Sequence, residues 1–231
     1  MPENAVIVGA GQGLSASLAR QIARRGGRVV LAARTTAKLA DLGRETGARL
    51  VACDATQPAQ VDALFKEVEG HFGVPDLVVF NMSYRVRGPL AGLDVKEVER
   101  SLVATGYAGF LVGQAAAKAM LKRGSGSIFF TGASASVKGY AESAPFAMGK
   151  FALRGLAQSM ARELAPKNIH VAHFVIDGGI RAAGADQRAG ERGADGMLLP
   201  DEIAKTYLHI HDQHRSAWSW EIELRPWSEK F

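Results

Sequence analysis

A short apolar segment that breaks into closely spaced glycines stands near the start of this chain. Residues 5–8 are apolar, and glycines at positions 9, 11 and 13 follow directly, before a run of small and apolar residues with helical spacing. This order predicts a strand, a glycine turn and a helix. Because glycine has no Cβ, a phosphate can approach the backbone of such a turn, and the N–H groups and positive dipole end of the helix favour an anion. The feature predicts a site for a nucleotide diphosphate.

Strand and helix patterns alternate along the rest of the chain. Mostly apolar runs predict six further strands, at 28–33, 48–53, 76–80, 127–131, 169–176 and 218–224. Helical patterns fall between them, at about 36–46, 58–72, 94–122 and 143–165, and again from Pro200. Strands of this kind belong to a parallel sheet that helices cover on both faces. The 231 residues contain no linker or repeat, so we predict a single α/β domain, a Rossmann-like doubly wound parallel sheet of about seven strands, with its ligand across the carboxyl ends of the strands.

Composition disfavours several classes of protein. Hydrophobic residues make up 47% of the chain, which is enough for a sizeable core, and the single cysteine, Cys53, excludes an internal disulfide framework and fits a reducing compartment. We expect no signal peptide and no membrane span, because no basic stretch precedes the first strand and no run of about 18 apolar residues occurs. The net charge of +5 is spread along the chain, which disfavours a nucleic-acid partner. We therefore expect a cytoplasmic protein without a metal site.

The end of the second predicted strand bears on the choice of cofactor. In dinucleotide-binding sheets an acidic residue there takes the ribose 2′-hydroxyl, whereas an arginine accommodates a 2′-phosphate. This strand ends in Ala32, Ala33 and Arg34, with no acid. The Arg34 guanidinium can clamp a phosphate through two hydrogen bonds, and the alternative is a solvated arginine before a helix. The sequence predicts that NADP(H) is preferred over NAD(H).

The glycine turn also resembles that of a known family. Written as Gly9-x-x-x-Gly13-x-Ser15, it is similar to the Gly-x-x-x-Gly-x-Gly turn of the short-chain dehydrogenase/reductase (SDR) family, with serine replacing the last glycine. The resemblance covers nearly the whole chain. It implies cofactor-binding roles for the following residues: Gly9, Gly11, Gln12, Gly13, Leu14, Arg34, Asp54, Ala55, Asn81, Met82, Ser83, Lys150, Gly178 and Ile180.

Two of these cofactor segments depart from the family's pattern. Residues 80–83 lie where SDR proteins have Asn-Asn-Ala-Gly, and only Asn81 matches. Asp177 and Gly178 replace the usual Pro-Gly after the sixth strand, with Ile180 where a backbone contact to the nicotinamide carboxamide is expected. Asp54 and Ala55 resemble the pair that meets the adenine.

The catalytic positions depart further. In SDR proteins a tyrosine exchanges the proton, a serine holds the substrate oxygen, and a lysine lowers the tyrosine pKa while binding the nicotinamide ribose. Here Ala133 and Phe146 occupy the serine and tyrosine positions, Lys150 is retained, and Thr105 falls near the position of the family's asparagine. Alanine and phenylalanine carry no hydroxyl. The family's standard mechanism therefore cannot operate in this chain.

Three interpretations stay open. In the first, the protein is an NADP(H)-dependent oxidoreductase with a rearranged site that acts on a small, unidentified carbonyl or alcohol substrate. The groups considered as replacements are Tyr84, Tyr140, Ser134, Ser136 and a water held by Lys150, while His173 is interpreted as an ordinary strand histidine. In the second, the protein binds NADP(H) without redox chemistry, as a sensor or regulatory subunit. The third, a packing partner with an empty turn, is disfavoured because so many cofactor residues fall at the expected places.

The resemblance has further implications for assembly and for the region around the site. SDR relatives commonly form homodimers or homotetramers through the two long helices, here at about 94–122 and 143–165. Residues 181–199 lie where the family carries its substrate lid, which we expect to be mobile before ligand binds. The tail at 225–231 contains two aromatic residues and either docks on a neighbouring chain or covers the surface of its own.

Overall fold

One parallel sheet runs through the molecule. The computed structural model describes residues 3–182, 184, 186–193 and 195–229. Seven strands pair in the order β3-β2-β1-β4-β5-β6-β7, and every neighbouring pair is parallel. The strands are β1 (Asn4–Val8), β2 (Arg28–Ala33), β3 (Arg49–Ala52), β4 (Leu77–Phe80), β5 (Gly126–Thr131), β6 (Ile169–Ile176) and β7 (Glu221–Leu224). The predicted doubly wound α/β fold is confirmed.

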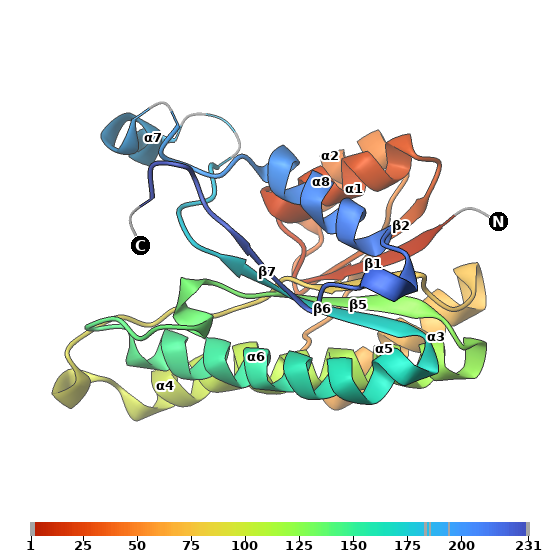
Figure 1. Ribbon diagram of the computed structural model, residues 1–231, viewed down its shortest axis with the longest axis horizontal. Helices are drawn as coiled ribbons and strands as arrows, with labels where there is room; N and C mark the ends of the chain where they lie inside the picture. Colours follow the sequence, from red (N-terminus) through yellow and green to blue (C-terminus); the bar gives the residue numbers. More distant parts are fainter. Residues whose placement is uncertain (1–2, 183, 185, 194, 230–231) are drawn as a thin grey trace.

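Helices cover both faces of this sheet (Figure 1). On one side lie α1 (Leu14–Arg24), α2 (Ala40–Thr46) and α8 (Pro200–His211), and on the other lie α3 (Pro58–Phe72), α4 (Val95–Leu102), α5 (Ala108–Arg123) and α6 (Ala144–Leu164). A short helix, α7 (Gln187–Arg192), stands apart above the carboxyl ends of the strands. None of the helices in the described part of the chain is long and apolar enough to cross a membrane.

The inner strands are mostly apolar because both of their faces are buried, whereas the edge strands β3 and β7 carry charged residues and are partly exposed. All residues of β1, β4 and β6 are buried. Alternate residues of the inner strands enter the two core clusters: in β1, Val6 and Val8 pack on the α3/α5/α6 side, whereas Ala5 and Ile7 pack on the α1/α2/α8 side. Each buried valine or isoleucine contributes about 1.5–3 kcal/mol to stability. This packing holds the carboxyl ends of the strands as a rigid edge.

The helix predicted at 94–122 is present as one continuous helical run that contains a π-helical turn. A π-helical turn at Val103–Tyr107 separates α4 from α5. The turn contains Thr105, which is fully buried. Single π-helical turns of this kind often occur at functional sites. The prediction of a long helix agrees with this run, but the π-helical turn was not predicted, because the spacing of apolar residues does not show which carbonyl oxygen each backbone N–H contacts.

Candidate functional site

Three cavities lie together along the carboxyl edge of the sheet, where the strand order reverses between β1 and β4. The largest has a volume of about 700 Å³, and its neighbours measure about 440 Å³ and about 350 Å³. Asn81, which follows β4, lines all three, and Ile180 lines the two larger ones. The carboxyl ends of strands at such a reversal are where doubly wound sheets bind their ligands. We call the 700 Å³ cavity the cleft.

The glycine turn forms the wall of the 440 Å³ cavity, together with Gln12 and Leu14. Gly9 has a φ of +80°, and a Cβ placed on it would lie 2.8 Å from the Met82 Cβ and 2.9 Å from the Asn81 backbone, so no side chain fits there. A Cβ on Gly11 or Gly13 would meet nothing within 4 Å. These two positions leave open space beside the backbone at the start of α1, which suits a diphosphate.

Ser15 explains the departure from three glycines. Its side chain is buried, and its Oγ accepts a hydrogen bond of 2.8 Å from Asn81 Nδ2. This bond ties the first helix to the end of β4, across 66 positions of sequence. The serine therefore adds a link between the two walls of the cofactor region that a glycine would lack.

Arg34 lines the 350 Å³ cavity at the end of β2, together with Thr35, Lys38 and Ala55. Arg34 and Lys38 are both exposed, so two cations border the same cavity. Gln12 Nε2 donates a hydrogen bond to the Lys38 carbonyl oxygen and so joins this segment to the glycine turn. Lys38 was not among the predicted cofactor residues, although it lies only four residues after Arg34, at the start of the next helical segment.

Of the two residues expected to meet the adenine, Asp54 and Ala55, only one lines a cavity. Ala55 lines the 350 Å³ cavity, but Asp54 does not. The Asp54 carboxylate accepts hydrogen bonds from the Thr56 backbone N–H at 3.0 Å and from the Thr56 hydroxyl at 2.7 Å. Its oxygens thus stabilise the local turn, and the structure does not bring this side chain to the cavity.

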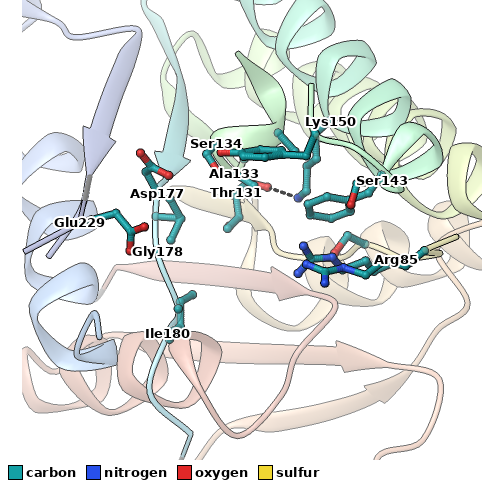
Figure 2. Close-up of a pocket in the computed structure, with 18 of the residues that line it drawn as sticks. Arg85, Thr131, Ala133, Ser134, Ser143, Lys150, Asp177, Gly178, Ile180 and Glu229 are labelled. Atoms are coloured by element: carbon teal, nitrogen blue, oxygen red, sulfur yellow. Dashed lines mark hydrogen bonds between the residues drawn. The ribbon is translucent and has the colours of Figure 1, made fainter. Parts of the chain in front are cut away.

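Lys150 is the central charged group of the cleft. It lies on α6 with 4% of its surface exposed, and its Nζ donates a hydrogen bond of 2.7 Å to the Thr131 carbonyl oxygen (Figure 2). Burial lowers the pKa of Lys150 to about 7. A lysine with such a pKa can both give and take a proton near neutral pH.

An aromatic ring separates Lys150 from an arginine. The Phe146 ring centroid lies 5.8 Å from Lys150 Nζ and 4.9 Å from Arg85 Cζ. The ring carries no hydroxyl, so it cannot exchange a proton, but both of its cationic neighbours lie within reach of its π-electrons. Arg85 was not among the residues predicted for the site.

The cleft brings some of the candidate hydroxyls together. Ser134 and Tyr140 line it, beside Ala133. Ser143 lines it as well, from the position directly before α6, and was not considered from the sequence. Figure 2 shows Ser143 near Arg85 on the side of the cleft opposite Asp177 and Glu229.

Other candidate residues lie outside the cleft. The Tyr84 hydroxyl donates a hydrogen bond of 2.6 Å to Glu97 on α4, and Tyr84 does not line the cleft. The Ser136 Oγ is buried and accepts a hydrogen bond of 3.1 Å from the Ala133 backbone N–H. Both hydroxyls have local structural partners, and neither residue lines the cleft.

Two further residues support α6 and β5 from behind. Thr105 packs against Gly149, where an added Cβ would lie 2.9 Å from the Thr105 Cβ, and it does not line the cleft. His173 is buried with its Nδ1 3.1 Å from Glu221 Oε2, and burial lowers the pKa of His173 to about 4. His173 is therefore neutral at pH 7, as expected for an ordinary strand histidine.

The segment after β6 forms the far wall of the cleft. Asp177 is buried and lies 3.2 Å from Arg225 and 3.7 Å from Lys138. Gly178 has a φ of +142°, and a Cβ on it would lie 2.8 Å from the Pro226 ring, so the tail packs directly on this glycine. Met82, Ser83 and Ile180 line the cleft as predicted positions of the cofactor site.

The lid and the tail lie over this wall. Arg188 of α7 lines both the cleft and the 440 Å³ cavity, and Glu229 of the tail lines the cleft. Glu229 thus contacts the cleft of its own chain, while Trp227 of the tail is 83% exposed. Residues 183, 185 and 194 of the predicted lid, and residues 230 and 231 of the tail, lie outside the described residues.

In the described part of the chain, no three His, Cys, Asp or Glu side chains are grouped so that they could hold a metal ion.

Comparison with known proteins identifies the family. The family model for short chain dehydrogenases matches residues 3–190. The chain is 35% identical to a short-chain dehydrogenase from Rhodopseudomonas palustris whose solved structure superposes with a TM-score of 0.85, covering 97% of this chain and 99% of that one. The hydroxynaphthalene reductase-like protein Arp2 of Metarhizium robertsii is 30% identical over 210 residues, 87% of this chain and 78% of the relative. A metagenomic short-chain oxidoreductase solved with NADP is 27% identical, covers 97% of each chain and gives a TM-score of 0.83. This chain belongs to the short-chain dehydrogenase family of oxidoreductases.

Proposed function

We propose that this protein binds NADP(H) and catalyses hydride transfer between the nicotinamide and the carbonyl carbon of a small substrate, with Lys150 in the role of the missing tyrosine. The observation that carries the proposal is the position of Lys150, which is buried at the wall of the cleft and held by the Thr131 carbonyl oxygen. When bound, the reduced nicotinamide supplies the hydride. The overall reaction converts a carbonyl compound, NADPH and a proton into an alcohol and NADP⁺.

The proton has a defined source in this scheme. The Lys150 ammonium gives a proton from Nζ to the carbonyl oxygen, and the neutral amine then takes a proton from water. In the direction of alcohol oxidation, the neutral amine accepts the proton instead. Ser134 and Ser143 both line the cleft. We assign their hydroxyls as hydrogen-bond donors to the substrate oxygen. Each such donor is worth about 10²- to 10³-fold in rate at an oxyanion site.

The cofactor assignment has two supports. Gly11 and Gly13 leave open space beside the backbone at the start of α1, and a relative at 27% identity was solved with NADP.

The second open interpretation, an NADP(H)-binding sensor or regulatory subunit, is favoured by Ala133 and Phe146, since neither carries the hydroxyl of the standard mechanism.

One experiment separates these two functions. Purified protein is mixed with NADPH and a panel of aldehydes, ketones and quinones, and NADPH absorbance is followed alongside NADPH binding by calorimetry. Turnover with any carbonyl compound supports the oxidoreductase. Binding of NADPH without oxidation across the panel favours the regulatory function, and absence of binding overturns both.

The preference for NADP(H) rests on Arg34. Replacing Arg34 by alanine is expected to weaken NADPH binding by about 10- to 100-fold, since hydrogen bonds to charged groups contribute about 1.5–3 kcal/mol. Binding of NADH, which has no 2′-phosphate, should stay within about twofold. Calorimetry with both nucleotides measures this, and Lys38→Ala tests the second cation of the same cavity. Equal affinities for NADPH and NADH in the unmodified protein would contradict the prediction.

We also infer a homodimer or homotetramer and a cytoplasmic location. Large apolar side chains stand exposed on the outer sides of α5 and α6: Phe110, Leu121, Met148 and Phe151. Exposed apolar side chains of this kind favour a protein interface, and the same two helices form it in SDR relatives. For the location, the single cysteine, Cys53, is free and buried, which suits a reducing compartment.

A further inference from the structure

Two arginines enter the cleft from the segment that follows β4. Arg85 and Arg87 both line it, two positions apart in sequence. Figure 2 shows the Arg85 side chain extending into the cleft, opposite the wall formed by Gly178 and Ile180. The Arg85 guanidinium stands over the Phe146 ring, with Cζ 4.9 Å from the ring centroid. The ring supports the guanidinium on one face and leaves its N–H groups free to bind a ligand.

These arginines differ from the others that line the same cleft. Arg188 forms an ion pair with Asp186 at 2.8 Å, and Arg192 forms one with Glu229 at 3.3 Å. Over the described part of the chain, no ion pair joins Arg85 or Arg87 to a carboxylate within 4 Å.

The carboxylates of the cleft do not neutralise the pair. Three acidic residues line it: Glu142, Asp177 and Glu229. Asp177 contacts Lys138 and Arg225, and Glu229 contacts Arg192. Burial, together with the charge of Arg87, lowers the pKa of Arg85. Two like charges held near each other in a partly desolvated cleft are unfavourable alone, and a bound anion relieves this repulsion.

We infer that Arg85 and Arg87 bind an oxyanion group of the substrate, a carboxylate or a phosphate, so that the protein acts on small anionic carbonyl compounds. A guanidinium presents its N–H groups as a planar fork that matches both anions. That the bound anion is a substrate rests on the proposed function, whereas the binding of an anion at these arginines does not require hydride transfer. The inference also gives Phe146 a role, since its ring supports the Arg85 guanidinium at the wall of the cleft.

Binding is tested first, without turnover. Benzoate, phenyl phosphate and the neutral analogue benzamide are titrated into the protein with and without NADP⁺ and followed by calorimetry. We expect at least one of the two anions to bind about tenfold or more tightly than benzamide, and the better anion identifies carboxylate or phosphate as the preferred group. Benzamide binding as tightly as both anions would overturn the inference.

Charge variants locate the anion. Arg85→Gln and Arg87→Gln are each expected to weaken binding of the preferred anion by about tenfold or more, whereas Glu142→Gln, which removes a negative charge from the cleft, should tighten it. Arg162→Gln is the matched control, because Arg162 is exposed on α6 and lines none of the three cavities. Unchanged anion binding in both arginine variants would overturn the assignment.

Turnover separates this inference from the proposed function. With 4-carboxybenzaldehyde as substrate, Arg85→Gln is expected to raise KM about tenfold or more, and with 4-nitrobenzaldehyde it should leave KM within about twofold. Anion binding that depends on Arg85 in a protein that oxidises no NADPH would refute the oxidoreductase and leave the anion site in place. NADPH oxidation that shows no preference for anionic aldehydes would refute the anion site and leave the oxidoreductase.

Discussion

Replacing Lys150 by methionine is expected to lower kcat for carbonyl reduction by about 10²- to 10⁴-fold, the loss typical of removing a positioned acid. Methionine keeps most of the apolar stem that packs in α6 and removes the Nζ that contacts the Thr131 carbonyl oxygen. Initial rates of NADPH oxidation measure the effect. An Arg162→Gln protein serves as the control for an α6 cation far from the cleft. A variant that keeps its kcat would show that Lys150 does not transfer the proton.

The pH dependence gives this prediction a second readout. Burial lowers the pKa of Lys150 to about 7, and carbonyl reduction needs the ammonium form. The rate of reduction should therefore fall as pH rises through about 7, while the rate of alcohol oxidation should rise over the same interval. In Lys150→Arg the cation cannot release its proton in this range, so the limb near pH 7 should vanish together with most of the activity. A flat profile in the unmodified protein would contradict the assignment.

Stability should change in the opposite direction from activity. The pKa of Lys150 is about 7 in the folded protein and about 10.4 in an unfolded chain. Between these values the unfolded state binds more protons, so stability rises with pH across this window, and below about pH 7 the folded state carries the full cost of a buried ammonium. Lys150→Met should therefore melt at a higher temperature than the unmodified protein at pH 7 and below. A lysine retained only for structure would give a less stable variant.

The fold was predictable because its determinants are local. Mostly apolar runs marked the strands, and the bounds of β2, β6 and α3 agree with the predicted ranges. By contrast, α7 contains small, polar and charged residues with no apolar stripe. Its sequence therefore has no helical periodicity of apolar residues from which the helix could be predicted. The π-helical turn at Val103–Tyr107 was missed because apolar spacing does not report the hydrogen-bond pattern.

The site was predictable where backbone position decides it. Gly9, Gly13 and Lys150 line the cavities because a strand end or a helix places them there. Side-chain direction was harder to predict. Tyr84 turns to Glu97 on α4, and Arg85, one residue later, enters the cleft. The bond between Ser15 and Asn81 spans 66 positions and has no counterpart in any short sequence window.

Ala133→Ser combined with Phe146→Tyr is expected to raise kcat by about 10²-fold or more, because it restores a positioned acid and a donor to the substrate oxygen. Both positions line the cleft. The ring at 146 lies 5.8 Å from Lys150 Nζ and 4.9 Å from Arg85 Cζ, measured to its centroid. Two neighbouring cations favour the ionised phenol and should lower the pKa of the introduced tyrosine. NADPH oxidation with the best carbonyl compound of the panel measures the gain.

The background of this variant decides how its result is interpreted. In Lys150→Met the same two substitutions should recover much less activity, since one of the two cations that lower the phenol pKa is lost. If the double variant gains nothing while its NADPH affinity is unchanged, the hydroxyls at 133 and 146 do not meet the substrate oxygen. The proton would then come from Lys150 or from another group of the cleft, such as Tyr140. A gain, in contrast, would mean that this chain retains the family's geometry around a cleft from which only the two hydroxyls are missing.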